Sequence, residues 1–254
     1  MKAPAHPPRV LVCAGLDPGG GAGLLADLEA LAAAGARGWA VATALTAQGP
    51  RGARGSFPVE PGIVLAQVDA LLEGARELPR AVKTGMLGSG ANAAALAGRL
   101  AARPLGRVPL VVDPVLFASS GLSLLDAADA REALDALLAR AALATPNWPE
   151  LEALAGRTLG SEEEAVRAAR ELPSRAVLVK GGHREGEPVD LLVRGRTVVR
   201  FRGRRRPGTA RGTGCRLASA VAGFLARGAT LEEAVRRAKR LVERYLDAAG
   251  RGRS

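Results

Sequence analysis

Short apolar runs alternate along the chain with segments in which apolar residues recur every three or four positions. This alternation is typical of parallel strands joined by crossover helices. The pattern therefore predicts a doubly wound, mostly parallel α/β sheet. The runs that read as buried strands each end in a loop containing Gly, Pro, Asp or Lys, and they are residues 9–15, 38–47, 80–86, 108–115 and 175–182.

Helical periodicity occupies most of the segments between these strands. The sequence SEEE, which begins at Ser161, is a capping box with acidic residues in the first turn of a helix. The sequence VDLLVRGRTVVRF predicts a hairpin that turns at residues 194–196, and two helices are expected after it. The other expected helices are residues 23–34, 61–78, 91–102, 127–142 and 161–172.

No repeat, low-complexity tract or linker interrupts this order. We therefore expect one domain over residues 1–254, with its core at about residues 9–246. In a doubly wound sheet, ligands bind beside the carboxyl ends of the strands. The loops that follow the predicted strands are thus the places to look for chemistry.

Cysteine and histidine are scarce, with 2 of each in 254 residues. A Cys/His metal cluster or a histidine-based triad is therefore nearly excluded, and two thiols about two hundred positions apart form no disulfide framework. The apolar run at residues 10–13 is too short for a signal sequence or a membrane span. We expect a cytoplasmic protein with reduced thiols and no membrane association.

The formal charge of +11 raises the question of a nucleic-acid partner. Arginine supplies all but four of the 36 basic residues, which resembles a compositional bias more than a binding surface. The basic run RFRGRRR at residues 200–206 contains a single aromatic residue, Phe201, and aromatic residues, which stack on bases in single-strand binders, are only 3% of the chain. We therefore expect no nucleic-acid partner.

The first predicted strand runs into the glycine-rich sequence GLDPGGGAG at residues 15–23, where glycines let the backbone approach a ligand. Gly21, Gly23 and Ala26 fit the dinucleotide fingerprint, but that site also needs an acidic residue after the second strand. Residues 35–59 contain no Asp or Glu, and no GK[ST] follows the glycines. Both a dinucleotide site and a P-loop are therefore disfavoured.

Charged side chains follow the middle strands of the predicted sheet. Lys83 and Lys180 come at strand ends, and we expect Lys83 to point into the crevice. Asp113 either caps a turn or faces a metal–phosphate group. Asn147 and Glu150 stand three residues apart where a helix begins. In one interpretation Asn147 is the N-cap and Glu150 is an acidic residue of the first turn. In the other, Glu150 holds a magnesium-bound water near nucleotide phosphates.

The sequence GTGC, residues 212–215, precedes an apolar helix. Gly212, Thr213 and Gly214 would direct backbone N–H groups toward an anion at the helix N-terminus, and a transferring phosphoryl group is such an anion. The same field is expected to lower the pKa of Cys215. The alternative is a small buried cysteine that packs the start of a helix.

Several of these segments occur together in the order and spacing of one kinase group. They are AGLDPGGGAGLLADLEAL, VKTGML, VVDPV, TPNWPELEAL, VLVKGGH and GTGC. With them the chain resembles the hydroxymethylpyrimidine/phosphomethylpyrimidine kinases of thiamin biosynthesis, in the ribokinase-like superfamily. The resemblance implies a three-layer α/β fold without a large lid domain, in a homodimer. It also implies that ATP and Mg²⁺ serve to phosphorylate 4-amino-5-hydroxymethyl-2-methylpyrimidine and then its monophosphate.

The resemblance also implies roles for residues at matching positions. Cys215 would be the base that receives the hydroxyl proton, and residues 212–214 would form the anion hole. Asp113 and Glu150 would lie on the magnesium side. Lys180 and Asp113 would meet the nucleotide phosphates, and the pyrimidine pocket would contain Gly15, Asp27, Gln48, Met86 and Val115. From their positions beside these residues we also expect Asn147 and Arg211 on the phosphate side.

Some positions depart from the family's usual sequence. Ser119 stands where a lysine is usual, residues 47–50 read AQGP in place of AQNT, and Arg211 and Arg216 flank the GTGC motif. We expect that the two arginines substitute for the missing lysine or change which substrate fits. Two alternatives stay open, namely a pyridoxal or pyridoxine kinase and a catalytically weak paralogue that binds the pyrimidine.

Overall fold

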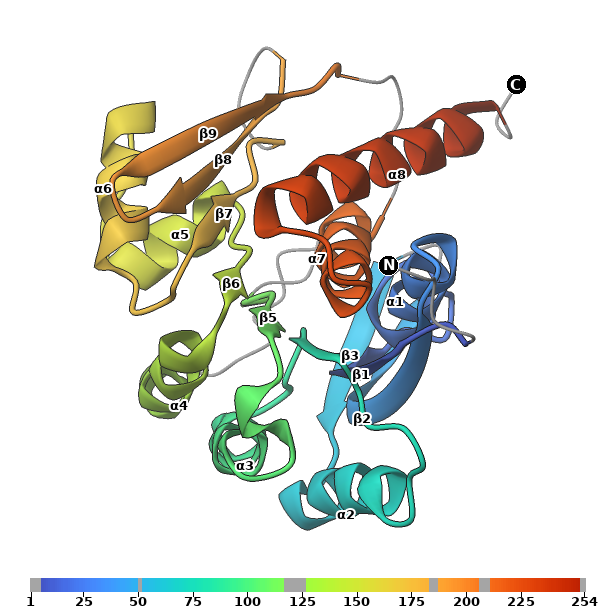
Figure 1. Ribbon diagram of the computed structural model, residues 1–254. Coiled ribbons are helices and arrows are strands. Elements are labelled where there is room, and N and C mark those ends of the chain that lie inside the picture. The colour runs from blue at the N-terminus through green and yellow to red at the C-terminus, as the bar shows by residue number, and fades with distance from the viewer. Residues whose placement is uncertain (1–5, 50–51, 117–126, 183–186, 206–210, 252–254) are drawn as a thin grey trace.

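A computed structural model describes residues 6–49, 52–116, 127–182, 187–205 and 211–251 of the chain. Its strands form one sheet of nine in the order β3-β2-β1-β4-β5-β6-β7-β8-β9 (Figure 1). Strands β2 to β7 in this order are parallel, whereas β3 at one edge and the β8–β9 hairpin at the other are antiparallel. The strands are β1 (Arg9–Leu16), β2 (Arg37–Gly49), β3 (Gly52–Pro58), β4 (Ala81–Thr84), β5 (Leu110–Val112), β6 (Leu143–Ala144), β7 (Val177–Val179), β8 (Val189–Arg194) and β9 (Thr197–Arg202).

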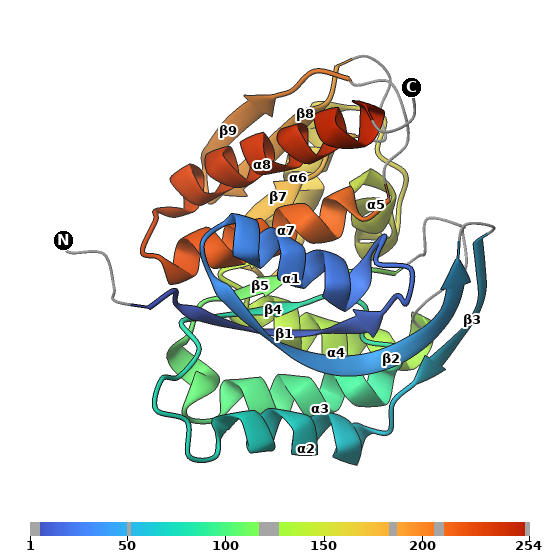
Figure 2. The same ribbon diagram turned by 90° about the vertical axis from the view of Figure 1, so that its right-hand side faces the viewer.

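Helices cover both faces of the sheet and give three layers (Figure 2). α1, α7 and α8 pack together on one face, and α2, α3 and α4 lie on the other. The expected three-layer, mostly parallel architecture is thus confirmed, and no large lid is evident among the described residues. The helices are α1 (Gly23–Ala33), α2 (Pro61–Leu72), α3 (Gly90–Ala101), α4 (Ala127–Arg140), α5 (Trp148–Ala155), α6 (Glu162–Glu171), α7 (Thr213–Ala226) and α8 (Leu231–Arg251), with a short 3₁₀ turn at Leu105–Arg107.

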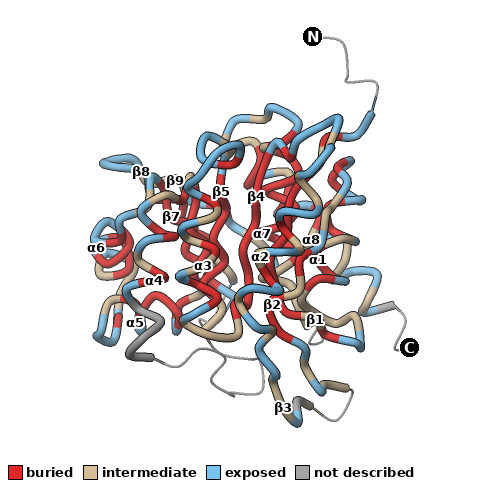
Figure 3. The backbone as a smooth tube through the Cα atoms, turned by 90° about the horizontal axis from the view of Figure 1, so that it is seen from below, coloured by how far each residue is buried: buried red, intermediate tan, exposed pale blue. Residues whose placement is uncertain are grey.

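The core is divided in two by the sheet, as the alternation of side chains along a strand requires. In β1, Val10 and Val12 pack with α7 and α8, while Leu11 and Cys13 pack toward α3 and α4. The central strands β1, β4 and β5 are buried along their lengths (Figure 3). Because both faces are covered, these strands read as continuous apolar runs.

The predicted elements agree with the structure except at three places. β3 was not expected, because the sequence GARGSFP shows no strand alternation and gains its conformation from pairing with β2. β6 was not expected either, since two residues carry no periodicity. The helix predicted over residues 61–78 ends at Leu72, two residues before Gly74, which adopts a positive φ of 64°.

Candidate active site

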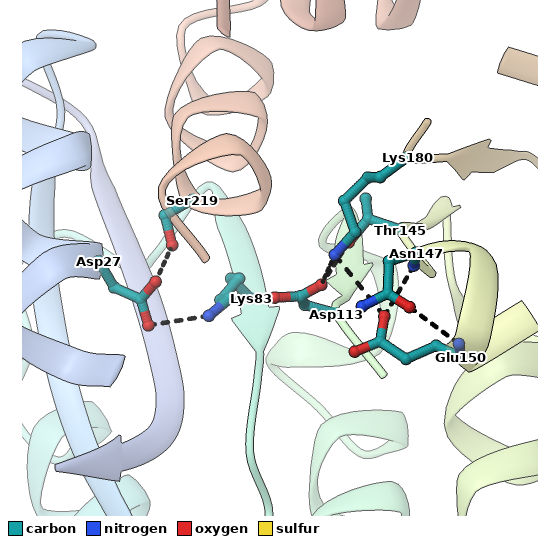
Figure 4. Close-up of polar contacts among 8 residues, drawn as sticks. All are labelled: Asp27, Lys83, Asp113, Thr145, Asn147, Glu150, Lys180 and Ser219. Carbon is teal, nitrogen blue, oxygen red and sulfur yellow. Dashed lines mark hydrogen bonds and ion pairs between the residues drawn. The ribbon is translucent and has the colours of Figure 1, made fainter. Parts of the chain in front are cut away.

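The carboxyl ends of β1, β4, β5, β6 and β7 and the N-terminus of α7 bring the predicted loops together. A buried cluster of charged groups lies there (Figure 4). The Lys180 Nζ lies 2.7 Å from Asp113 Oδ1 and 3.7 Å from Glu150 Oε2. Thr145 donates a further hydrogen bond of 2.9 Å to the same Asp113 oxygen. The structure thus unites three of the predicted phosphate-side residues.

The charges in this cluster stabilise one another. Burial alone would raise the pKa of Asp113, but the ammonium groups of Lys180 and Lys83 outweigh it and lower that pKa. Burial also raises the pKa of Glu150 to about 7, although Lys180 opposes the rise. Asp113 is therefore ionised at neutral pH, whereas Glu150 titrates near neutrality.

Asn147 and Glu150 form the expected capping box at the start of α5. The Asn147 side chain accepts a hydrogen bond of 2.8 Å from the Glu150 N–H, and Glu150 Oε2 accepts one of 2.7 Å from the Asn147 N–H. The N-cap interpretation is confirmed. The capping box leaves a phosphate-side role for Glu150 open, because the same Glu150 oxygen also faces the Lys180 ammonium.

The N-terminus of α7 lies against this cluster. Gly212 precedes the helix with a φ of 70°, and a Cβ added there would come within 2.2 Å of the Gly21 carbonyl oxygen. A Cβ on Gly214 would lie 3.1 Å from Lys180 Nζ, so the lysine ammonium lies beside the first turn of the helix. Free N–H groups and an ammonium group therefore meet at one place, which suits an anion.

The expectation of a lowered pKa for Cys215 is wrong for this structure. Burial, helped by the carboxylates of Asp113 and Asp27, raises the pKa of its thiol to about 11. The Lys83 charge and the backbone N–H of Gly23 lower the pKa of the thiol, but their effect is smaller than that of burial. Desolvation outweighs the helix field because it disfavours any charge on the sulfur. The resting side chain is a thiol at neutral pH.

Three of the predicted pyrimidine-pocket residues lie together. Met86 and Ala44 form a small apolar cluster against which Val115 packs. A Cβ on Gly15 would come within 2.8 Å of the Met86 sulfur, so only glycine fits there without a shift. Gln48 lies further along β2 and is half-buried. The structure thus groups Gly15, Met86 and Val115, with Gln48 near the end of β2.

Asp27, the remaining predicted pocket residue, is completely buried. Its Oδ2 accepts a 2.8 Å hydrogen bond from Lys83 Nζ, and its Oδ1 accepts one of 2.8 Å from the Ser219 hydroxyl. Both oxygens of the Asp27 carboxylate thus have partners within the protein, and its contact with the substrate stays a prediction. Lys83 was expected in the crevice, but it too is fully buried.

Sequence reasoning missed two polar residues of the site. The Thr84 hydroxyl is buried and has no hydrogen-bond partner in the described part of the chain, and it lines a small hollow with Asp113 and Val115. Asp17 holds the glycine-rich loop by accepting hydrogen bonds of 2.9 Å from the Gly19 N–H and 3.1 Å from the Ala22 N–H. The position of Asp17 just before the glycines was an available signal.

The two flanking arginines have different environments. Arg211 pairs with Asp17 at 3.2 Å and so links the glycine-rich loop to the start of α7. Arg216 is buried, pairs with Glu29 at 2.6 Å and lies 4.0 Å from the centre of the Tyr245 ring. The expectation that Arg216 replaces a phosphate-binding lysine is wrong, because its charge is used in packing. Ser119 lies outside the described residues.

We expect Arg216→Thr to lower stability and not turnover. The substitution removes an ion pair between the buried guanidinium and the exposed Glu29 carboxylate, a hydrogen bond to the Gly21 carbonyl and a cation–π contact, which together stabilise by about 2 kcal/mol. Thermal unfolding should show a melting temperature lower by roughly 4–8 °C, with kcat within about twofold of the wild type. Arg236→Thr is the control, since Arg236 pairs with Glu232 on the exposed side of α8. A large fall in kcat without a fall in melting temperature would contradict this assignment.

Known proteins resemble this chain over most of its length. The chain is 42% identical over 260 residues to the thiamine biosynthesis bifunctional protein ThiED of Geobacter sulfurreducens, covering 99% of this chain and 52% of that protein. The chain thus spans about half the length of that relative.

No described helix combines the length and hydrophobicity that a membrane span requires.

Solved structures show the same fold. The phosphomethylpyrimidine kinase of Clostridium difficile superposes with a TM-score of 0.78 at 34% identity, covering 96% of this chain and 99% of that one. The pyridoxal kinase of Staphylococcus aureus in complex with AMP-PCP and pyridoxal superposes with a TM-score of 0.80 at 28% identity, covering 94% and 87%. Because the family described as phosphomethylpyrimidine kinase also matches residues 17–252, this chain belongs to that family of ribokinase-like kinases.

Proposed function

We propose that this chain uses ATP to phosphorylate 4-amino-5-hydroxymethyl-2-methylpyrimidine and then its monophosphate, in the cytoplasm. The observation that carries the proposal is the meeting of Lys180, Asp113 and the N-terminus of α7 beside Cys215. An ammonium group and helix N–H groups at one point stabilise the charge of a transferring phosphoryl group. The family membership and the AMP-PCP complex of the pyridoxal kinase support ATP as the donor.

In the first step the substrate hydroxyl oxygen bonds to the γ-phosphorus as the bond from that phosphorus to the β–γ bridging oxygen breaks. ADP leaves, and the hydroxyl proton passes to the Cys215 sulfur, which must first be a thiolate. The high pKa of the thiol makes that thiolate a minor species. Little proton removal is needed until late in a loose transition state, so the proposed role remains chemically consistent.

Asp113 and Glu150 are the residues proposed to hold Mg²⁺, in part through water. Mg²⁺ prefers carboxylate oxygens and substrate phosphates and keeps several waters. The two carboxylates lie on either side of Lys180 and are both buried, which fits an ion that arrives with ATP. When bound, Mg²⁺ neutralises phosphate charge. Asn147 and the N–H groups of Arg211 that Asp17 does not use are proposed to face the same phosphates.

The proposal is tested by ADP release from purified protein with Mg-ATP. Hydroxymethylpyrimidine, its monophosphate and pyridoxal are compared at equal concentrations. Turnover of the first two supports the proposal and both of its steps. Turnover of pyridoxal alone would replace this proposal by a pyridoxal kinase activity, which is the activity named for the similar S. aureus structure. Pyrimidine binding without ADP release would indicate the catalytically weak paralogue.

We also propose a homodimer formed through the β2–β3 ribbon. Leu45 and Phe57 are directly paired across β2 and β3 and are 48% and 60% exposed. Ile63, at the start of α2 just after this ribbon, is 56% exposed. Large apolar side chains clustered on one surface are typical of an interface between subunits.

Phe57→Asp should therefore convert the dimer to a monomer, because it places a charge at the centre of the apolar surface. Light scattering after size-exclusion chromatography measures the change as a halved mass. Leu78→Asp is the matched control, since Leu78 is an exposed leucine outside the ribbon. A wild-type chain that elutes as a monomer would refute the dimer.

A further inference from the structure

A buried network beneath the helix N-terminus has no role in the function proposed above. Lys83 from β4, Asp27 from α1 and Ser219 from α7 are each fully buried, and Asp27 contacts both of the others (Figure 4). The Lys83 Nζ and Asp27 Oδ2 lie 2.8 Å apart, and the Ser219 hydroxyl donates to the other Asp27 oxygen at 2.8 Å. A buried ion pair of this kind adds little net stability compared with apolar residues.

The network lies next to Cys215 through the geometry of α7. Ser219 follows Cys215 by four residues, so the two side chains project from the same face of the helix, one turn apart. Asp27 therefore binds α7 just below the turn that carries the thiol. The Asp27–Lys83 pair extends from that contact toward the carboxyl end of β4.

The position of the ammonium group is closely defined. A Cβ on Gly85 would come within 2.7 Å of Lys83 Nζ, so the chain leaves room for the lysine by having glycine there. Burial disfavours the ammonium, but the nearby carboxylates, Asp27 first and Asp113 after it, favour the charged form, and the pKa of Lys83 is raised. The group thus stays protonated at neutral pH, inside the protein, where its field is weakly screened.

We infer that Lys83 is a positioning residue for Cys215: its buried ammonium, anchored by Asp27 and Ser219, stabilises negative charge on the sulfur when the sulfur acts as a base. Lys83 has the largest effect among the charged groups that act on the thiol and favours the thiolate, as Lys180 also does, while Asp113 and Asp27 oppose it. Lys180 lies against the same helix turn at Gly214. The catalytic meaning of this inference rests on the proposed function of Cys215.

The test is the rate at which iodoacetamide alkylates Cys215 in the full chain without substrates. Mass spectrometry measures this rate from about pH 7 to about pH 9, a range over which the thiolate fraction of Cys215 rises. Lys83→Met should raise the pKa of the thiol by about one unit. At a fixed pH the thiolate fraction then falls about tenfold. A thiolate of higher pKa is intrinsically more nucleophilic, which offsets part of this loss, so alkylation should slow by about three- to fivefold. Cys215→Ala gives the background from Cys13, a buried thiol whose pKa burial raises to about 12.

Ser219→Ala is the matched control. It disturbs the same network on the same helix turn but keeps both charges, so alkylation should stay within about twofold of the wild type. If Lys83→Met does not fold, the double variant Lys83→Met/Asp27→Asn removes both charges and leaves no unpaired buried ion. It should also slow alkylation, because the effect of Lys83 on the thiol exceeds that of Asp27.

A folded Lys83→Met or double variant with the wild-type alkylation rate would overturn the inference. An equal slowing in Ser219→Ala would overturn it as well, because it would show that packing and not charge controls the thiol. The experiment is independent of the proposed function. A chain that fails to phosphorylate the pyrimidine but shows the expected alkylation rates would refute the kinase proposal and retain the electrostatic role of Lys83.

Discussion

Cys215→Ala should fold normally and lose about a hundredfold to a thousandfold in kcat, because it removes the proposed proton acceptor. KM for ATP should change little, since the side chain of residue 215 is not needed for the backbone N–H groups that face the phosphates. Initial rates of ADP release with hydroxymethylpyrimidine give both parameters. Circular dichroism and thermal unfolding check the fold.

The pH dependence gives a second measurement on the same variant. Burial raises the pKa of the Cys215 thiol to about 11, so the thiolate fraction grows as pH rises toward that value. The kcat/KM of the wild type should therefore increase with pH above neutrality, and this increase should be absent from Cys215→Ala. Cys13→Ala is the control, because Cys13 is buried in the core of β1. Near-normal turnover by Cys215→Ala would return Cys215 to a packing role.

Lys180→Met should cause the other large loss, about a hundredfold to a thousandfold in kcat, because it removes the ammonium group at the proposed phosphoryl position. The variant also leaves the carboxylates of Asp113 and Glu150 without their shared cation. Added repulsion near the phosphates should raise the KM for ATP as well. Steady-state kinetics in ATP at saturating pyrimidine measure both effects.

Lys239→Met is the control for Lys180→Met. Lys239 also forms an ion pair with a buried aspartate, Asp190, but it projects from α8. Its replacement should lower the melting temperature while kcat stays within a few-fold of the wild type. If both lysine variants lost activity equally, the loss in Lys180→Met would reflect stability, and the phosphate role of Lys180 would be wrong.

Local sequence patterns were sufficient for the alternation of parallel strands and helices and for the N-caps at Ser161 and Asn147. The box at Ser161 and Glu164 and the box at Asn147 and Glu150 each involve residues three apart, so their hydrogen bonds follow from sequence spacing. Strand β3 was missed because its hydrogen bonds depend on β2 and not on its own pattern. Thr84 was missed because an unpartnered hydroxyl is visible only once its neighbours are known.

The sequence by itself determined the α/β class, the loops that hold the site and the near-exclusion of histidine and metal-cluster chemistry, because these depend on periodicity and residue type. The tertiary structure alone decided the environments of the charged groups. Lys83 and Asp27 are separated by 56 positions, and Arg216 and Glu29 by 187, yet each pair is in contact. The thiol of Cys215 was expected to ionise from its place at a helix start, but burial raises its pKa. Desolvation and ion pairing depend on which distant segments pack together, and no local pattern specifies that.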